Sequence, residues 1–426
     1  MAARRPTRFT LYPMQAAQLG PVAPHERTQS AFDLFLIFAG ANIVATTLQV
    51  GAALAGDYTP ATALGLIFVG SVLGAALVAA LAPLGPRLGV PSVIAARAAL
   101  GTRGAALVAL LLYLTNFAWI AVNNVIAASV CARALGPAGS ERVWAVGLGL
   151  LATAIVAFGP RAVGLADRLA VPLMLVVGAV LTLACLRLPA PPPRPSSTAS
   201  LVRGLDVVVG YQVSWLLMFA DYSRYTPSER KSLVAVFLGL ALTSMWFMPI
   251  GWLAARTAGS SDPGAMLLAT GVGTAGALLI SLATLTTNFV NIYLSSLAWK
   301  SLLPETGDQA AIWSIGVIGT ALGLFSGPWL ERYSDLMLIL GSVLVPVGAV
   351  LFAHFFVVRT ATRVEDLYDR LGPFSRHGGF APAGVIAWIA GAVTYHAAGS
   401  IGSTIAGFVV AVTVYVAVAR GVNVKG

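Results

Sequence analysis

Residues 281–295 read SLATLTTNFVNIYLS and place a polar stripe inside a segment that is otherwise apolar. The polar side chains follow one another at spacings of three and four, so they share one face of a helix. They are Ser281, Thr284, Asn288, Asn291 and Ser295. Lipid cannot satisfy hydroxyl and amide groups, so a membrane helix must turn this face toward protein, water or a ligand. The stripe therefore predicts part of a pathway.

The composition predicts an all-α polytopic membrane protein. Apolar residues make up 58% of the chain and charged residues 10%, against about 25% charged in soluble domains. Mean hydropathy is +0.85. Apolar runs close to the roughly 20 residues of a bilayer-crossing helix recur along the chain, and we predict twelve transmembrane helices. They are 31–55, 60–82, 104–134, 143–159, 164–187, 202–222, 232–256, 265–298, 311–327, 333–358, 381–396 and 399–419. The third and eighth are long enough to include a kink or a surface helix.

The distribution of basic residues predicts the orientation. The first 30 residues are polar and basic and lack the apolar core of a cleavable signal peptide. With this segment in the cytoplasm, 19 of the 26 lysines and arginines lie inside and 7 outside, as the positive-inside rule requires. We therefore expect a multi-pass protein of the cell membrane with cytoplasmic N- and C-termini. The net charge of +10 then faces anionic lipid, and no nucleic-acid partner is needed to explain it.

Two connections divide the chain. A Pro-rich external linker at 189–201 separates two groups of five helices, and a charged cytoplasmic loop at 359–380 precedes the last two helices. The predicted units are a basic tail (1–30), a first five-helix repeat (31–188), the linker, a second five-helix repeat (202–358), the loop, two additional helices (381–420) and a cytoplasmic tail (421–426).

Corresponding helices of the two halves contain interruption signals. The first helix carries Gly40-Ala41-Asn42 and the sixth carries Gly210-Tyr211-Gln212 followed by Ser214-Trp215. Glycine weakens a helix, and a mid-membrane amide needs a partner. We predict broken helices there, which is where inverted-repeat transporters bind substrates and cations. The alternative, close helix packing, is the better interpretation of Gly70-x-x-x-Gly74 and Gly319-x-x-x-Gly323.

The third helix adds recognition chemistry. Asn116, Trp119 and Asn123 lie on one face. An indole surface with an amide one turn away suits a planar heterocycle that carries alternating C=O and N–H groups. The alternative is an interfacial Trp with amide bonding between helices.

Several stretches together resemble the nucleobase–cation symporter-1 family, which includes purine, cytosine, uracil, allantoin and hydantoin permeases; the purine–cytosine permease branch is the most similar. The matching stretches are Phe38–Asn42 (FAGAN), Gly89–Ser92 (GVPS) with Ala96, Arg97 and Gly101, Ala118–Asn124 (AWIAVNN), Asp221–Tyr225 (DYSRY) and Thr286–Tyr293 (TTNFVNIY).

The resemblance implies a LeuT-like fold, with five-plus-five inverted repeats and two C-terminal helices. It also implies that Trp119 stacks on the substrate ring and that Asn123 hydrogen-bonds it. A sodium site would lie between the first-helix backbone near Gly40 and Asn42 and an eighth-helix pattern. That pattern is Ala283, Thr286 and Thr287. Neutral oxygens suit a hard monovalent cation.

The sequence departs from the family pattern at three places. Gln212 stands where some relatives have a second stacking Trp; Trp215 lies one turn later, and Tyr211 is another candidate ring. Asn42 is a further candidate substrate ligand. On the eighth helix, either Asn288 or Asn291 would contact substrate. His354 stands where many relatives carry Asp, and we interpret it as a structural group.

The sequence thus predicts a monomeric secondary symporter that imports a planar nitrogen heterocycle, a nucleobase or a related compound, with Na+ or H+ and without a cofactor. Thr286 and Thr287 favour sodium, and Asp206 is the nearest carboxylate for proton transfer. Asp221 and Arg224 would hold a cytoplasmic gate or form a solvated pair. A channel or a membrane enzyme is the alternative, but no cluster of His, Asp or Glu has catalytic or metal-binding spacing.

Overall fold

The computed structural model describes residues 19–137, 139–158, 160–188, 199–303, 305–325, 332–399 and 402–423. The predicted tails and linker lie partly outside this range, at 1–18, 189–198 and 424–426. The main helices are α1 (Ala31–Asn42), α2 (Ala45–Leu54), α3 (Pro60–Leu81), α4 (Leu84–Leu88), α5 (Ser92–Ala95), α6 (Arg97–Leu135), α7 (Glu141–Ala157), α8 (Pro160–Cys185), α9 (Leu201–Val213), α10 (Glu229–Ala258), α11 (Pro263–Ala269), α12 (Gly273–Leu302), α13 (Asp308–Gly323), α15 (Tyr333–Phe352), α16 (Arg376–Gly379), α17 (Pro382–Ala397) and α18 (Ser403–Asn423). Short helical turns, η2 (Leu216–Met218), η3 (Ser223–Tyr225) and η5 (Glu365–Leu367) among them, complete the described chain.

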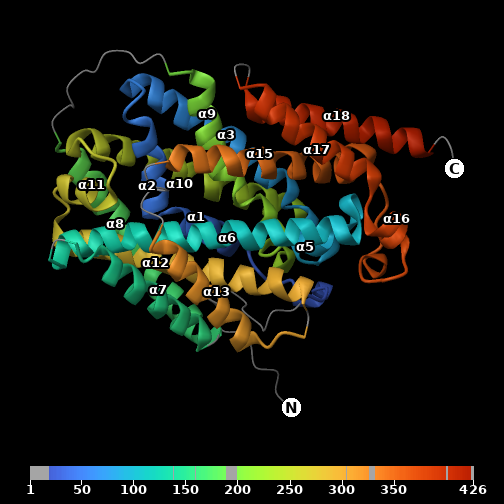
Figure 1. Ribbon diagram of the computed structural model, residues 1–426, viewed down its shortest axis with the longest axis horizontal. Coiled ribbons are helices and arrows are strands. Elements are labelled where there is room, and N and C mark those ends of the chain that lie inside the picture. Colours follow the sequence, from blue (N-terminus) through green and yellow to red (C-terminus); the bar gives the residue numbers. More distant parts are fainter. Residues whose placement is uncertain are drawn as a thin grey trace.

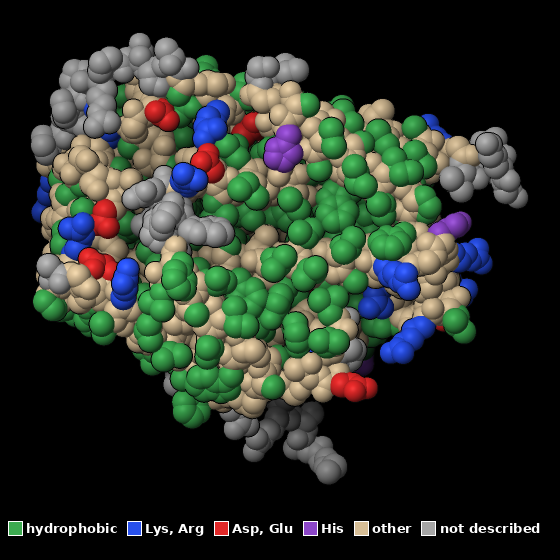
Figure 2. Space-filling view, viewed as in Figure 1, with side chains coloured by type: hydrophobic (Ala, Val, Ile, Leu, Met, Phe, Trp, Pro, Cys, Tyr) green, Lys and Arg blue, Asp and Glu red, His purple; other side chains and the backbone are tan. Residues whose placement is uncertain are grey.

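The helices form a layered bundle whose long members, such as α6 and α15, run along one direction (Figure 1). Seven helices in the described ranges are long and apolar enough to cross a membrane, or up to nine if each bent pair counts as one span. Figure 2 shows the matching surface, with an apolar middle and charged side chains toward the two ends. The all-helical prediction is confirmed. Each of the twelve predicted segments overlaps a helix, but the count of twelve spans stays a prediction.

One of the two long predicted segments divides and the other does not. The third, 104–134, lies wholly within α6, whose helical path is interrupted before this segment, at Gly101 with φ of 81°. The eighth becomes the short α11 and the long α12. Glycine at 101 is required because a positive φ is unfavourable for other residues, and because a Cβ there would lie 2.8 Å from the Ala381 backbone nitrogen.

The first membrane helix is broken. It starts at Ser30, whose hydroxyl accepts a hydrogen bond from the Asp33 N–H at 3.0 Å. It ends at Asn42, and the chain bends by 57° before α2 begins. The break releases the Asn42 carbonyl, which then accepts a hydrogen bond from the Thr47 hydroxyl at 2.5 Å. The buried polar group at the break is therefore satisfied within the chain.

The second interruption lies four residues beyond Gly210. Helix α9 continues through Gly210 to Val213, and the chain turns at 214–215 before η2. Gly210 instead allows close packing, since a Cβ would clash with the Met337 carbonyl on α15. The broken sixth helix was predicted in the correct segment, but Gly210 is not its cause.

Glycines also set the approach of neighbouring helices elsewhere. A Cβ at Gly70 would lie 2.7 Å from Val208, and one at Gly319 would lie 2.6 Å from Ile120. The close-packing interpretation of these two motifs is confirmed. The tightest such contact joins α2 and α10, where a Cβ on Gly51 would clash with the Met248 carbonyl and one on Gly251 with the Leu48 carbonyl.

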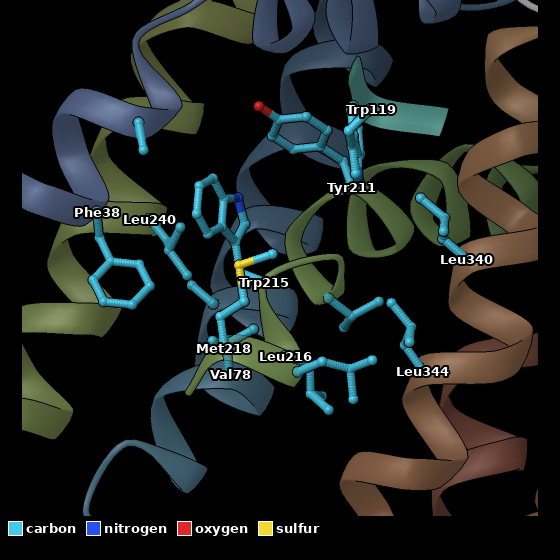
Figure 3. Packing of buried hydrophobic residues seen from close by; sticks show 14 of the residues in the cluster. Phe38, Val78, Trp119, Tyr211, Trp215, Leu216, Met218, Leu240, Leu340 and Leu344 are labelled. Carbon is cyan, nitrogen blue, oxygen red and sulfur yellow. The ribbon is translucent and has the colours of Figure 1, made fainter. Parts of the chain in front are cut away.

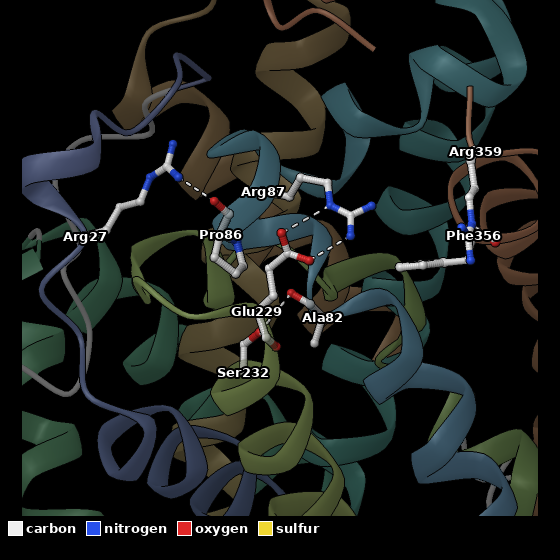
Figure 4. A network of polar contacts seen from close by, with 8 residues as sticks. All are labelled: Arg27, Ala82, Pro86, Arg87, Glu229, Ser232, Phe356 and Arg359. Carbon is white, nitrogen blue, oxygen red and sulfur yellow. Dashed lines mark hydrogen bonds and ion pairs between the residues drawn. The ribbon is translucent and has the colours of Figure 1, made fainter. Parts of the chain in front are cut away.

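Residues 19–29, which we call the strap, cross one end of the bundle. Arg27 donates to the Val22 carbonyl at 3.0 Å and to the Pro86 carbonyl, beside an Arg87–Glu229 ion pair (Figure 4). The Tyr368 hydroxyl donates to the Leu19 carbonyl at 2.5 Å. Burial raises the pKa of Tyr368 to about 12, so the hydroxyl keeps its proton at physiological pH.

Asp221 and Arg224 lie at this same end, which we call the strap end. Asp221 accepts a hydrogen bond from the Ser92 N–H at 3.4 Å. Arg224 is 1% exposed and donates to the Gly20 carbonyl and the Tyr225 hydroxyl. Neither side chain is solvated, so the loop-pair alternative is wrong for this conformation.

The glycine contact between α2 and α10 gives a first test. Gly251→Ala should lower the free energy of unfolding by about 1–3 kcal/mol, because the added methyl meets rigid backbone. The measurement is thermal unfolding in detergent. Gly65→Ala is the matched control, since nothing lies within 4 Å of its Cβ position, and it should gain about 0.5–1 kcal/mol. Equal unfolding temperatures for Gly251→Ala and the wild type would contradict the contact.

Candidate binding site

A small cavity lies where both broken helices meet α6 and α12. Its lining is formed by Ala41, Thr46, Trp119, Asn123, Tyr211, Ser214, Trp215, Met218, Thr287 and Asn291. These side chains are all uncharged. The cavity measures about 20 Å³, room for about one ordered water. This conformation is therefore nearly closed, and a heterocycle would enter only when the walls move apart.

Aromatic rings form much of the wall. The Trp119 and Tyr211 rings meet edge to face with centroids 5.9 Å apart, and Trp215 lies next to them (Figure 3). Phe38 packs against the Trp215 ring at 5.9 Å, and the Tyr211 hydroxyl lies 2.6 Å from the Thr47 hydroxyl. The two rings that the sequence offered in place of a second stacking Trp, Tyr211 and Trp215, are both present at the cavity.

A row of asparagines lies across α6 and α12. The Asn288 amide oxygen accepts hydrogen bonds from Asn123 at 3.1 Å and Asn291 at 3.4 Å, while its nitrogen donates to Asn124 at 2.8 Å. Asn291 and Asn123 line the cavity, whereas Asn288 lies behind them. The structure thus separates the two alternatives on this helix: Asn291 faces the cavity and Asn288 orients its neighbours.

Asn123 has an unused acceptor. Its amide oxygen is buried and has no hydrogen-bond partner in the described part of the protein. A buried carbonyl without a partner costs about 1–3 kcal/mol, so this atom is suited to accept an N–H from a ligand.

Asn42 and Gln212 do not face the cavity. Asn42 donates to the Thr243 and Ser244 hydroxyls on α10 at 2.8 and 2.7 Å. Gln212 donates to the same Ser244 hydroxyl at 2.8 Å. Both amides tie a broken helix to α10, and their predicted contact with substrate does not fit this geometry. The reason is that both amides are held by the Ser244 hydroxyl on α10, and neither lines the cavity.

The candidate cation ligands divide into two groups. The Thr287 hydroxyl lines the cavity and has no partner among the described residues. Thr286 donates to the Ala283 carbonyl at 2.7 Å, which leaves lone pairs on both oxygens. The Gly40 carbonyl accepts from the Ile43 N–H at 3.3 Å, and the Asn42 side chain is committed to α10. Of the predicted cation ligands, Thr287 thus lines the cavity, whereas the Asn42 amide is used in contacts with α10.

Four lining residues were missed from the sequence: Ala41, Thr46, Ser214 and Met218. Thr46 and Ser214 lie in the two interruptions, so the helix breaks themselves were the available signal. Other candidates lie elsewhere. The His354 ring nitrogen is 2.6 Å from the Tyr415 hydroxyl, and Asp206 accepts from the backbone N–H groups of Ser403 and Thr404 at 3.0 and 3.1 Å.

Comparison with known sequences gives consistent matches. A family model described as permease for cytosine/purines, uracil, thiamine and allantoin matches residues 21–419. A putative purine-cytosine permease of Bacillus subtilis, YxlA, is 24% identical over 381 residues, covering 82% of this chain and 81% of the relative. The cytosine permease of Escherichia coli K12 is 24% identical over 352 residues, covering 80% and 81%.

Solved structures show the same fold. Mhp1, a nucleobase-cation-symport-1 family transporter in a closed conformation with bromovinylhydantoin bound, superposes with a TM-score of 0.81 at 17% identity, covering 98% of this chain and 97% of Mhp1. A Na+-coupled sialic acid symporter gives a TM-score of 0.59 at 12% identity, covering 95% and 93%.

The shared contact on α10 gives a second test. Ser244→Ala should lower the free energy of unfolding by about 1–3 kcal/mol, because both Asn42 and Gln212 lose a buried acceptor. Thr257→Ala is the control on the same helix, since that hydroxyl bonds only to the Leu253 carbonyl at 3.0 Å. Chemical or thermal unfolding in detergent measures both variants. Equal stability of the two would show that the amides do not depend on Ser244.

Proposed function

Because the chain belongs to the nucleobase–cation symporter-1 family of permeases for cytosine/purines, uracil, thiamine and allantoin, we propose that it is a secondary symporter that imports a planar nitrogen heterocycle. The observation that carries the proposal is the uncharged cavity between the two helix breaks. Aromatic faces from α6, α9 and the following turn border it, and the free Asn123 acceptor lies in its wall.

The cavity chemistry defines the proposed substrate class. Trp119 offers a face on which a flat ring stacks. The Asn123 oxygen accepts a ring N–H, and the Asn291 amide pairs with a neighbouring donor or acceptor. No charged side chain lines the cavity, so a neutral ring with C=O and N–H edges fits better than a carboxylate or an ammonium compound.

Sodium is the coupling ion that the described side chains support better. Thr287 and Thr286 present neutral oxygens on α12, beside the backbone freed at the first helix break. Asp206, the carboxylate considered for proton transfer, is instead bound by two N–H groups at the start of α18. Both carboxylate oxygens of Asp206 are thus engaged at the start of α18, and the side chain does not line the cavity.

The proposed cycle follows from the placement of the site. The strap end faces the cytoplasm of a cell-membrane protein, with both termini inside, as the basic residues predict. Sodium and substrate bind from outside, and the group containing α1, α2, α3, α9 and α10 then rocks against α6 and α12 to open the cytoplasmic side. A monomer contains all residues of the site.

Stacking on Trp119 gives a third test. Trp119→Ala should weaken heterocycle binding by about 1–3 kcal/mol, roughly 5- to 160-fold in the dissociation constant. Trp313→Ala is the control, because that indole is 41% exposed on α13 and lies outside the cavity. Thermal-shift titration with cytosine, uracil, hypoxanthine, allantoin and hydantoin measures binding. No stabilisation of the wild type by any of these would argue for a channel or an enzyme, and unchanged affinity in Trp119→Ala would remove the stacking role.

The sodium proposal gives a fourth test. In proteoliposomes, replacing external sodium by choline at fixed pH should abolish concentrative uptake. Thr287→Val should raise the sodium concentration for half-maximal uptake about tenfold or more, because it removes an oxygen ligand while keeping the side-chain shape. Thr394→Val on α17 is the control, since that hydroxyl bonds only to the Ala390 carbonyl. Uptake that persists undiminished in choline would exclude sodium coupling.

A further inference from the structure

A second cavity is lined by residues where α2 and α10 end and where α9 and α15 begin. Figure 1 shows these helix ends on the side of the bundle away from the strap. Its volume is about 390 Å³, within the range of small-molecule sites. We call it the outer cavity. The lining residues that matter here are Gln49, Asp57, Arg203, Arg256, Arg332 and Asp335.

A hydrogen bond joins the outer cavity to the binding cavity. Tyr333 lines the outer cavity, and Thr46 lines the binding cavity. The Tyr333 hydroxyl donates to the Thr46 carbonyl at 3.0 Å, and its side chain is 1% exposed. The tyrosine of α15 therefore forms part of the wall between the two spaces. A solute in the outer cavity would be one side chain away from the aromatic rings.

The outer cavity contains an unused acceptor. Gln49 is 1% exposed, and its amide nitrogen donates to the Ser261 carbonyl at 3.0 Å. This bond fixes the amide, and the amide oxygen has no partner among the described residues. As with Asn123, a buried oxygen of this kind is suited to accept a ligand N–H.

Three arginines line the same cavity as this acceptor. Arg256 is held with its guanidinium carbon 5.7 Å from the centre of the Trp252 ring. Arg203 pairs with Asp335 at 2.7 Å across the cavity rim. Three arginines and two aspartates leave the lining close to charge balance. Such a surface suits a neutral dipolar solute, whose carbonyl accepts from an arginine while its N–H donates to Gln49.

We propose that the outer cavity is a first binding site for the same planar heterocycles, occupied before the Tyr333–Thr46 contact opens. This proposal rests on the proposed function. It assigns Gln49 and Arg256 as substrate ligands on the external side and Tyr333 as the group that separates the outer site from the inner one. The occupant is a neutral ring with adjacent C=O and N–H groups.

Contacts made in the outer site and kept at the barrier that follows it affect rates but not the final affinity, because they lower that barrier equally for entry and for exit and are absent from the inner complex. Arg256→Met and Gln49→Leu should therefore each lower the association rate constant about five- to tenfold and lower the dissociation rate constant by the same factor. The dissociation constant of the inner site should stay unchanged. Stopped-flow tryptophan fluorescence with cytosine, uracil and allantoin measures both rates, since Trp119 and Trp215 line the inner cavity.

Arg142→Met is the matched control, because Arg142 is an exposed arginine that lines a different cavity, beside Glu141 and Asp262. Its two rate constants should equal those of the wild type. Unchanged association rates in both Arg256→Met and Gln49→Leu, with the wild type still binding a heterocycle, would overturn the outer site alone. A changed dissociation constant with an unchanged association rate would also overturn it, because a site off the route or a folding defect produces that pattern. A wild type that binds none of the three compounds would overturn the proposed function and the outer site with it.

Discussion

The two helix breaks depend on one set of acceptors on α10. Asn42, at the end of α1, and Gln212, near the end of α9, both donate to the Ser244 hydroxyl, at 2.7 and 2.8 Å. Both also reach the Leu240 carbonyl, at 3.2 and 3.4 Å. A break in a buried helix exposes polar groups that lipid cannot satisfy. The Asn42 carbonyl freed at the first break is satisfied by the Thr47 hydroxyl, and the two side-chain amides hold α1, α9 and α10 together as one group.

The contacts of Asn42 and Gln212 with α10 form one polar seam. A second polar seam joins α6 and α12 on the other side of the cavity. Asn288 on α12 bonds to Asn123 and Asn124 on α6, and Ser281 donates to the Ala127 carbonyl at 3.0 Å. Each seam is internal to its own group of helices. The described side-chain contacts between the groups near the cavity are fewer, such as the Ala45 N–H to the Thr284 hydroxyl at 3.2 Å. The cavity thus lies between the two sets of polar contacts, and in the proposed symporter the two groups of helices would move apart there.

The sequence predicted what depends on periodicity and composition. The stripe on 281–295 indicated a buried polar face, and Asn291 and Thr287 do line the cavity. Trp119 was identified from its spacing to neighbouring amides, and Tyr211 and Trp215 were identified from the family resemblance. Periodicity does not give the direction of an amide at a helix break, because the chain turns there and the register of the face is lost. That is why Asn42 and Gln212 were assigned to the ligand, while Thr46 and Ser214 were missed. Gly210 packs against α15, which lies more than a hundred residues later in the chain. The local sequence around Gly210 gives no sign of this contact.

The position of Thr287 and Asn291 has a consequence for coupling. They lie four residues apart on α12, one helical turn, and line the same cavity. In the proposed symporter the cation would be held from the Thr287 side and the ring from the Asn291 side, so the walls that one ligand orders are already placed for the other. By linkage, any gain in ring affinity from bound sodium equals the gain in sodium affinity from the bound ring. The Asn288 amide joins this turn of α12 to Asn123, the free acceptor across the seam. Asn288, which contacts neither proposed ligand, therefore fixes the positions of the two proposed sites relative to each other.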